Sequence, residues 1–588
     1  MFFLKFLIDF LKKYYALLIG LVVVSILSAI TYHGDFYMIS KMSERVAGGN
    51  FHIYDNLFIN GIDYGKFIMP PLIFLVDGAI FFIFKLLHII NFDFGLGFPS
   101  FWESFLLKSR YILLFLLSYP LIKQAALSYT KNDNKLSNRI ANLWITSPLL
   151  LFLPFAQGNN DIIPVFFTLI FLFFAFKKKY LWAMVFLGLT AALKNYALFL
   201  IPPMAIILSD RDIKKTLKYG IIAGVAYLAP ILFYIKDINH FFTGGGEGLY
   251  IFKAVIPSHI NYMIFPIIYI LLLTYLIFDK KASAKTKEAD IVFYGFLFMS
   301  LFYAISHFFP QWFLWILPFL IFAIYNKRHL FYIYTSIVFV FLFSLITSWS
   351  NNLDITLFGP VLSSSANNIL FPRMSGLVSL ASSVFVGLLL AFIYVLFKER
   401  LVADKIRSSE KVTVFLNLLP LILYLVFLSF LVFVSSISES HDQELRDQAL
   451  RGNYKTIQSF NVGDIKTSES YANINKTGDS YIPTSADPSV VLSLPNTIKE
   501  SNLYALIEFG GHGVSSPQVY WANDQKIFSE DNSSLSPINL GGNTYLFPLK
   551  KTFAGLSLGK EVNIKYLRID PSNTKNNFLL NGVSIIKL

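Results

Sequence analysis

The acidic residue Asp35 stands where the first apolar segment, Tyr15 to Thr31, gives way to a polar stretch that runs from His33 to Pro71. A carboxylate at the mouth of a membrane helix is costly unless binding or chemistry uses it. Limited solvent at a membrane boundary would raise the pKa of such a carboxyl group and suit it to taking a proton from a substrate. A helix-end carboxylate in an ordinary wet loop is the alternative interpretation.

Three more ionisable residues, Asp161, Lys194 and Arg373, lie near the ends of later apolar segments. Asp161 could bind hydroxyl groups, hold a divalent ion together with Asp35, or only cap the next helix. Lys194 and Arg373 are cations of the kind that bind phosphate groups. For Lys194 the alternative is a side chain that runs along apolar surface and leaves its ammonium group in water.

The composition predicts the elements that must position these residues. The chain has 588 residues, of which 55% are hydrophobic and 62 are Phe, and its mean hydropathy is +0.58. These values exceed what a soluble core needs and predict a polytopic α-helical membrane protein in contact with a lipid bilayer. The net charge of +13 does not indicate a nucleic-acid partner, because Lys and Arg occur in short clusters between apolar runs.

Topology follows from those clusters. Lys5, Lys12 and Lys13 precede the first apolar segment, which predicts an uncleaved signal-anchor helix with a cytoplasmic N-terminus. The segment from Pro70 to Ile90 starts with two prolines and contains Asp77 and Lys85, so we expect a juxtamembrane helix that does not cross the membrane. About thirteen spans then put every dense basic cluster inside and all the candidate residues outside.

Cysteine is absent, which excludes disulfides and thiolate metal sites. We expect a transmembrane domain over residues 1–436, in which residues 33–90 form an extracytoplasmic loop with juxtamembrane helices. Residues 180–209 are expected to form two short helices with a break near Lys194. Residues 437–480 are expected to be a linker, and 481–588 an extracytoplasmic β-sandwich domain, because short apolar runs alternate there with Gly, Asn, Asp and Pro.

Sequence motifs then suggest a family. Asp35-Phe36-Tyr37, Gly48 to Asp55, Tyr64 and Pro70-Pro71-Leu72 together resemble the first extracytoplasmic loop of GT-C superfamily glycosyltransferases. The nearest resemblance is to polyprenyl-phosphate-mannose-dependent mannosyltransferases, such as the catalytic subunit of GPI mannosyltransferase I and its bacterial relatives. Those enzymes often carry two acidic residues, one residue apart, at the start of this loop. Here His33 occupies the first of the two positions.

Two later stretches extend the resemblance. Phe155 to Asp161, followed by Gly188 to Lys194, is similar to the Gly-Gln-x-Asp and Gly-Leu-x-x-x-x-Lys pair of these families. His307 to Trp315 is similar to their Gln-Tyr-Phe-x-Trp-Tyr segment.

The resemblance implies transfer of a sugar, mannose in the named relatives, from a polyprenyl-phosphate donor to a glycan or lipid-linked acceptor on the extracytoplasmic face. Asp35 would be the general base and Asp161 a second catalytic residue. Lys194 and Arg373 would bind the donor phosphate. Other substrate contacts would come from Tyr37, Tyr64, His307 and Gln311. Trp312 and Trp315 could stack on a sugar, although anchoring at the membrane interface is the favoured role.

No cofactor is required by this scheme, and a divalent metal, if one binds, would lie at Asp35 and Asp161. The alternatives are a transporter or flippase for lipid-linked sugars, which would need charged groups spread across the midplane, a protein O-glycosyltransferase of the same fold, and a non-catalytic scaffold. A composition rich in Lys, Asn and Ile and free of cysteine favours a prokaryotic plasma membrane. In the β-domain, a carbohydrate-binding role is a further expectation.

Overall fold

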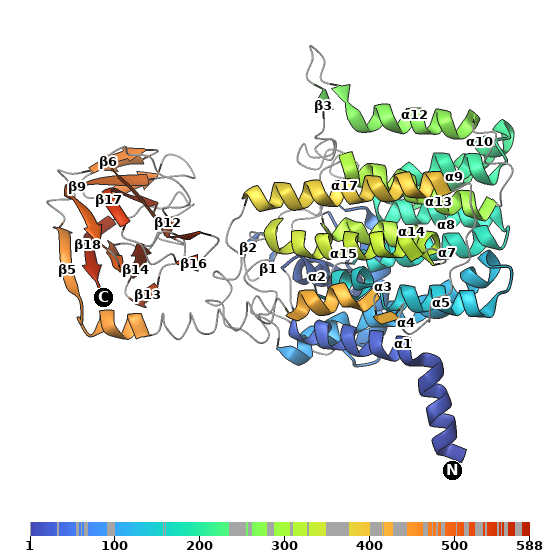
Figure 1. The fold of residues 1–588 in the computed structure, drawn as a ribbon, viewed down its shortest axis with the longest axis horizontal. Helices are drawn as coiled ribbons and strands as arrows, with labels where there is room; N and C mark the ends of the chain where they lie inside the picture. The colour runs from blue at the N-terminus through green and yellow to red at the C-terminus, as the bar shows by residue number, and fades with distance from the viewer. Residues whose placement is uncertain are drawn as a thin grey trace. The chain divides into compact units, whose positions relative to one another are not determined.

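The structure is a computed structural model of the whole chain, and the chain forms two compact units, residues 1–364 with 375–428 and residues 365–374 with 429–588. Each unit is described separately (Figure 1). The structure describes residues 2–588 except for 32–33, 55–57, 60–61, 64–68, 91–99, 157, 159, 235–254, 257–261, 279–286, 306–309, 326–327, 349–374, 400–413, 416, 427–443, 462–468, 473, 478–479, 484–488, 501, 511–516, 524–532, 535–537, 542, 550–551, 554–555, 558–561 and 571–578.

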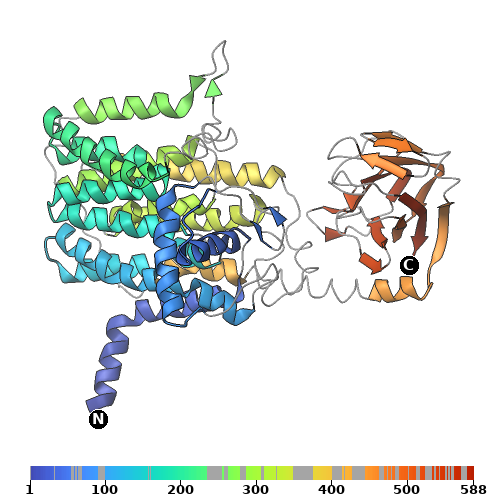
Figure 2. The same cartoon turned by 180° about the vertical axis from the view of Figure 1, so that it is seen from behind.

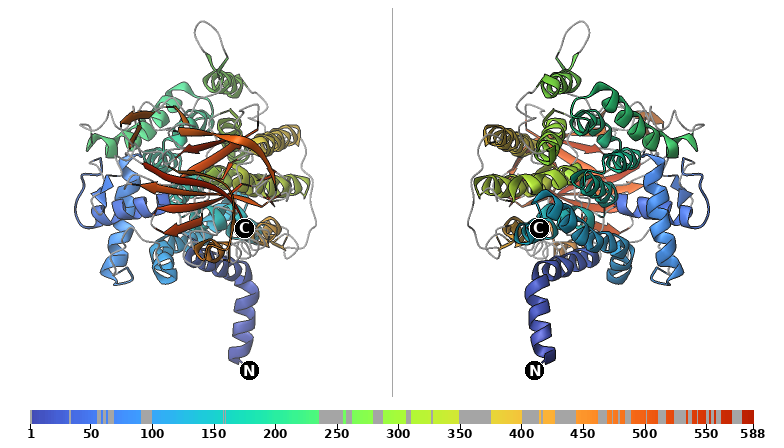
Figure 3. Two further views of the ribbon diagram at one scale, coloured as in Figure 1. Left: turned by 90° about the vertical axis from the view of Figure 1, so that its left-hand side faces the viewer. Right: turned by 90° about the vertical axis from the view of Figure 1, so that its right-hand side faces the viewer.

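The first unit is helical, and most of its long helices run in a common direction, as the end-on views show (Figure 3). Its helices in chain order are α1 (Phe2–Ile30), α2 (Gly34–Ala47), α3 (Pro71–Leu86), α4 (Phe101–Tyr129), α5 (Asn134–Ile145), α6 (Pro148–Ala156), α7 (Ile162–Phe176), α8 (Tyr180–Leu193), η1 (Asn195–Leu200), α9 (Ile201–Leu208), α10 (Ile213–Leu232), α12 (Ile264–Phe278), α13 (Lys287–Ile305), η6 (Pro310–Ile316), α14 (Leu317–Ile324), α15 (Arg328–Ser348) and α17 (Ser375–Glu399). Short hairpins pair β1 (Phe58–Ile59) with β2 (Ile62–Asp63) and β3 (Val255–Ile256) with β4 (Tyr262–Met263).

Several of these helices are suited to a membrane. Among the described residues, three helical segments are long and apolar enough to cross one: Phe101–Tyr129, Asn134–Ala156 and Lys287–Ile305. Shorter apolar helices of 10 to 17 residues accompany them. The segment Asn134–Ala156 is 94% buried, so α5 and α6 form the centre of the unit. These features are those of a helical membrane protein.

The expected extracytoplasmic loop contains two helices. Part of the polar stretch after Thr31 folds as α2, and α3 begins at Pro71, a position where the missing backbone N–H of proline is tolerated. Figure 2 shows α3 lying across the helices of the bundle instead of alongside them.

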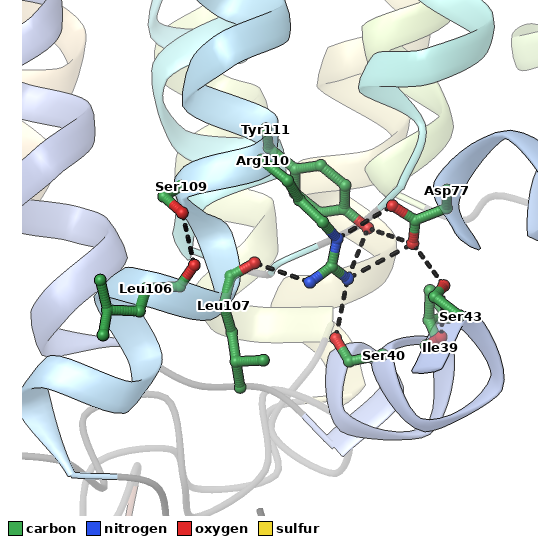
Figure 4. A network of polar contacts seen from close by, with 9 residues as sticks. All are labelled: Ile39, Ser40, Ser43, Asp77, Leu106, Leu107, Ser109, Arg110 and Tyr111. Atoms are coloured by element: carbon green, nitrogen blue, oxygen red, sulfur yellow. Dashed lines mark hydrogen bonds and ion pairs between the residues drawn. The ribbon is translucent and has the colours of Figure 1, made fainter. Parts of the chain in front are cut away.

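A buried polar network fastens α2 and α3 to α4 (Figure 4). Arg110 on α4 forms an ion pair with Asp77 on α3, with 2.9 Å between Nε and Oδ1, and both side chains are fully buried. Arg110 Nη2 donates to Ser40 Oγ at 2.8 Å, and Ser43 Oγ donates to Asp77 Oδ2 at 2.7 Å. Tyr111 adds a hydroxyl 3.3 Å from Asp77 Oδ2. Because both charges are hydrogen-bonded from several sides, the network fixes the position of α2.

The second unit is built from two antiparallel five-stranded sheets, with strand orders β13-β14-β10-β18-β5 and β12-β11-β17-β9-β6. The inner faces of both sheets contribute to one core that includes Leu492, Ile507 and Trp521, which makes the unit a β-sandwich. The strands are β5 (Lys455–Asn461), β6 (Glu469–Ala472), β7 (Ile474–Thr477), β8 (Ser480–Pro483), β9 (Ser489–Glu500), β10 (Leu503–Gly510), β11 (Gln518–Ala522), β12 (Ser533–Ser534), β13 (Ile538–Gly541), β14 (Thr544–Leu549), β15 (Thr552–Phe553), β16 (Leu556–Ser557), β17 (Val562–Asp570) and β18 (Leu579–Lys587).

The expected boundaries of this unit need correction. Strands β5 and β6 lie inside the predicted 437–480 linker, yet β5 pairs with β18 and β6 pairs with β9. Both are the outermost strands of their sheets, where polar residues replace the apolar alternation that marks inner strands. Leu445 and Ala449 also pack against the sandwich. The linker interpretation is therefore wrong for strands β5 and β6 and for the segment that carries Leu445 and Ala449.

Candidate active site

Asp161 lies in the turn between α6 and α7, at the N-cap position of α7. Its side chain makes no capping hydrogen bond, so the helix-cap interpretation of this residue is wrong. The residue is fully buried, as is its neighbour Asn160. The amide group of Asn160 has no hydrogen-bond partner among the described residues. Buried polar groups of this kind need an explanation other than packing.

Lys194 is the partner of Asp161. Helix α8 ends at Leu193, and Lys194 takes an extended conformation with φ −153° and ψ 126°. Its Nζ lies 3.3 Å from Asp161 Oδ1, and the exposed fraction of the side chain is 12% for Lys194 and 0% for Asp161. The ammonium group therefore binds a buried carboxylate and does not run along apolar surface to reach water.

Local chain geometry brings these two residues together. Helices α7 and α8 form an antiparallel hairpin joined at Lys177 to Lys179, so the start of α7 and the end of α8 lie at one end of the pair. Gly188 lets α8 pack closely on α10, because a Cβ atom there would collide with the backbone oxygen of Ala223. The glycine of the Gly-Leu motif thus serves packing.

Two interrupted helices meet beside the ion pair. Pro202 and Pro203 in the first turn of α9 cannot continue a helix from the preceding residues, and η1 forms there instead. The freed carbonyl of Phe199 accepts a hydrogen bond from the Tyr269 hydroxyl at 2.9 Å. Pro318 at the start of α14 follows η6 in the same way.

The two 3₁₀ segments contact each other through aromatic rings. Tyr196 of η1 stacks on Trp315 of η6 with 3.9 Å between ring centroids, and Trp315 stacks on Trp312 at 5.1 Å. Trp315 is 3% exposed, so the expected interface-anchor role is wrong for this residue. The sequence prediction missed Tyr196, and the only signal for it was an aromatic residue two positions after the cation in the helix break.

The electrostatics of Asp161 follow from its burial. Loss of solvent raises the pKa of the Asp161 carboxyl group, and the nearby Lys194 and Trp315 side chains oppose that rise. Burial is the larger effect. The carboxylate form of Asp161 therefore depends on the ammonium group of Lys194.

The start of α2 lies against the turn that carries Asp161. Phe36 packs on Gly158, where an added Cβ atom would lie 2.6 Å from Phe36 Cγ, and Gly158 has a φ of +65°. Both features require glycine. The backbone of Asp35 and Tyr37 is thus held at the same end of the bundle as Asp161, while the side chains of these two α2 residues are outside the described part of the structure.

The other predicted site residues fall partly or wholly outside the described residues. Gln311 belongs to the η6 backbone, four positions before Trp315, and its side chain is not described. His307, Arg373 and Tyr64 lie in segments that the structure does not describe.

The described residues contain no group of three His, Asp or Glu side chains that could hold a metal ion. The ammonium group of Lys194 already forms an ion pair with one carboxylate oxygen of Asp161. A divalent ion at this residue would have to compete with that cation for the same carboxylate.

One family model matches part of this chain. The model of glycosyltransferase family 87 matches residues 105–249, a range that contains both Asp161 and Lys194. The match supports glycosyltransferase activity of the GT-C type. Curated proteins yield no match to this chain. A glycosyltransferase acts on a donor and an acceptor substrate. The apolar helices indicate that this one is a membrane protein.

Proposed function

We propose that the chain transfers a sugar from a polyprenyl-phosphate donor to a hydroxyl group of a glycan or lipid-linked acceptor at the extracytoplasmic face of the membrane. Mannose is the sugar that the sequence resemblance implies. The observation that carries the proposal is the Asp161–Lys194 pair at the end of the α7–α8 hairpin, inside the family match and next to the start of α2. A cation with a partly exposed side chain and a buried counter-charge is suited to binding a phosphate group.

The proposed reaction is a single displacement at the anomeric carbon. Asp35 takes the proton of the acceptor hydroxyl, whose oxygen forms the new bond to the anomeric carbon. The bond from that carbon to the phosphate oxygen breaks, and its electron pair leaves with the phosphate. Lys194 neutralises the charge on the departing phosphate, with Arg373 as a second cation. Asp161 then acts by holding Lys194 in place, since its carboxylate is fully buried and 3.3 Å from Nζ.

The remaining assignments complete the proposal. Tyr37, Tyr64, His307 and Gln311 would contact the donor or the acceptor. Trp312, which is half-buried at the edge of the aromatic stack, is the ring most open to a sugar. The β-sandwich unit would bind the acceptor glycan.

The test uses membranes or proteoliposomes supplied with polyprenyl-phosphate mannose and a glycan acceptor, with turnover measured as sugar transferred. Asp35→Asn is expected to lower kcat by about 10² to 10⁴-fold, the range typical for loss of a general base. Lys194→Met is expected to raise the KM for the donor, because it removes a phosphate contact of the bound donor. It is also expected to lower kcat by about 10-fold or more, because negative charge grows on the departing phosphate and the contact is stronger in the transition state.

Two matched variants serve as controls. Glu44 lies on the same helix as Asp35 and forms an ion pair with Lys41 at 3.1 Å, so Glu44→Gln removes a carboxylate of α2 without a proposed role. Lys179→Met removes an exposed cation at the opposite end of α8. Both should retain turnover near that of the wild type. Wild-type turnover by Asp35→Asn would remove the base assignment, and transport of the donor without transfer would favour a flippase.

A further inference from the structure

Lys108 is a fully buried cation on α4 that has no role in the proposed reaction. Its Nζ donates to the carbonyl oxygen of Thr31 at 2.7 Å, to the hydroxyl of Thr31 at 3.0 Å and to the carbonyl oxygen of Phe155 at 2.7 Å. An ammonium group has three N–H donors. All three are therefore used by two residues that lie 124 positions apart in the chain.

Both partners lie at helix ends. Thr31 directly follows α1, and Phe155 is in the last turn of α6. The last carbonyl groups of a helix have no partner within it and carry the negative end of the helix dipole. Lys108 satisfies such a group on each helix. Among the described residues it forms no ion pair with a carboxylate, so its polar contacts are these carbonyl groups and the Thr31 hydroxyl.

Further hydrogen bonds and a ring contact join the segments around Lys108. The Thr31 hydroxyl also lies 3.1 Å from the Phe155 oxygen, and Ser104 Oγ, one turn before Lys108, donates to the Thr31 oxygen at 2.8 Å. The ring of Phe36 lies 5.6 Å from Lys108 Nζ, within the range of a cation–π contact. Lys108 thus contacts the end of α1, the end of α6 and the start of α2.

Two of these contacts are close in the chain to proposed site residues. Phe36 follows Asp35 directly, and Phe155 precedes Asp161 by six positions. Lys108 stabilises these contacts, because removing its donors would leave the buried carbonyl groups of Thr31 and Phe155 short of a hydrogen-bond partner. Accurate placement is a second reason for a lysine here, because a shift of about 1 Å at reacting groups can lower a rate by about 10²-fold.

We propose that Lys108 is a positioning residue that sets the separation between the segment carrying Asp35 and the segment carrying Asp161. The assignment of those two residues rests on the proposed function. The contact that Lys108 makes between the ends of α1 and α6 does not, and it can be measured without any activity.

The experiment compares Lys108→Met, which keeps the length of the side chain and removes its donors, with Lys123→Met on the same helix. Hydrogen exchange of the purified chain is expected to rise in Lys108→Met at residues 27–40 and 150–162 and to stay unchanged elsewhere in α4. Lys123→Met should leave both segments as in the wild type. Unchanged exchange at both segments in Lys108→Met would overturn the proposal.

Turnover with polyprenyl-phosphate mannose provides the second readout. Lys108→Met is expected to lower kcat by 10-fold or more with a change of less than threefold in the KM for the donor. If Lys108 acts through the placement of Asp35, the double variant Asp35→Asn/Lys108→Met should lose no more turnover than Asp35→Asn alone. Losses that multiply would identify a merely structural lysine and overturn the proposal.

Thr31 provides a milder pair of variants in case Lys108→Met does not fold. Thr31→Ser keeps the hydroxyl acceptor and should keep wild-type exchange and turnover, whereas Thr31→Val removes it and should raise exchange at both segments. Equal behaviour of the two would also contradict the proposal. If Asp35→Asn itself retains wild-type turnover, the proposed function fails while the exchange measurements still decide the role of Lys108.

Discussion

Asp161 and Lys194 are unequal members of one ion pair. The carboxylate is fully buried, whereas Lys194 keeps part of its side chain exposed. Burial favours the neutral form of Asp161, and the positive charge of Lys194 favours the charged form. A phosphate that approached Lys194 would compete for that same ammonium group. On the proposed function, the pair would therefore serve anion binding more than the stability of the fold.

This arrangement predicts an unusual response of stability to pH in Asp161→Asn. The folded chain binds the Asp161 proton more tightly than the unfolded chain does, because its pKa is raised from the ordinary value of 3.8. The stabilisation due to this group is complete below the unfolded pKa and is lost as the pH rises through the raised folded pKa. The difference in stability between Asp161→Asn and the wild type should therefore shift in favour of the variant as the pH rises from 4 to neutrality, because the variant has no carboxyl group to ionise. Turnover of the variant should fall by about 10-fold or more.

Thermal unfolding in detergent across that pH range measures this effect. The control is Asp133→Asn, because Asp133 is an exposed N-cap whose side chain accepts from the backbone N–H groups of Lys135 and Leu136, and Asn caps helices equally well. Its unfolding temperature should follow that of the wild type at every pH. A difference in unfolding temperature between Asp161→Asn and the wild type that stays the same from pH 4 to neutrality would contradict the prediction.

At the scale of elements, the site depends on helices that end or break at defined points. Helix α8 must stop at Leu193 for Lys194 to meet Asp161, and α9 and α14 must carry prolines for η1 and η6 to form. The close packing of α8 on α10 at Gly188 holds the end of α8 in place.

Two glycines of this helix pair give a matched test of that packing. Gly188→Ala is expected to destabilise the chain by about 1–3 kcal/mol, because its Cβ atom would collide with the Ala223 backbone and force α8 away from α10. Gly224→Ala, on α10, has open space and should stabilise by about 0.5–1 kcal/mol through helix propensity. Unfolding of both variants in denaturant would measure the difference, and equal stability of the two would contradict the packing role of Gly188.

Some of the fold and the site could be predicted from the sequence. The helix break at Lys194 was predictable because polar residues interrupt an apolar run, and the inner strand β17 because Val562 and Ile564 alternate with polar residues. The contacts of Tyr196 with Trp315 and of Lys108 with Phe155 were not predictable. Apolar periodicity shows which face of a helix is buried, but it does not identify the helix that packs against that face. The edge strands β5 and β6 escaped notice because they lack the alternating pattern.

At the scale of the whole molecule, the two units have separate cores. The sandwich buries Trp521, with 1% of its surface exposed, together with residues from both sheets. A unit with its own core can fold alone. Trp521 is also the only tryptophan of residues 429–588, so its fluorescence reports on this unit alone.

We therefore expect residues 437–588, expressed without the helical unit, to be soluble and to show a blue-shifted tryptophan emission that moves to longer wavelength in one cooperative transition on unfolding. The variant Trp521→Ala should be destabilised by about 3–5 kcal/mol and serves as the control for the assignment of the signal. Emission at the wavelength of exposed tryptophan before denaturant is added would contradict an independent core.

The buried pair of Asp77 and Arg110 limits the evolutionary paths open to this chain. Removing either partner alone leaves an uncompensated charge in the interior, at a cost of about 3–5 kcal/mol, which is comparable with the whole stability of many domains. Replacing both with apolar residues carries no such penalty. Homologous chains should therefore keep both residues or have lost both. In those that lost them, Ser40 and Ser43, which bond to this pair, are free to vary.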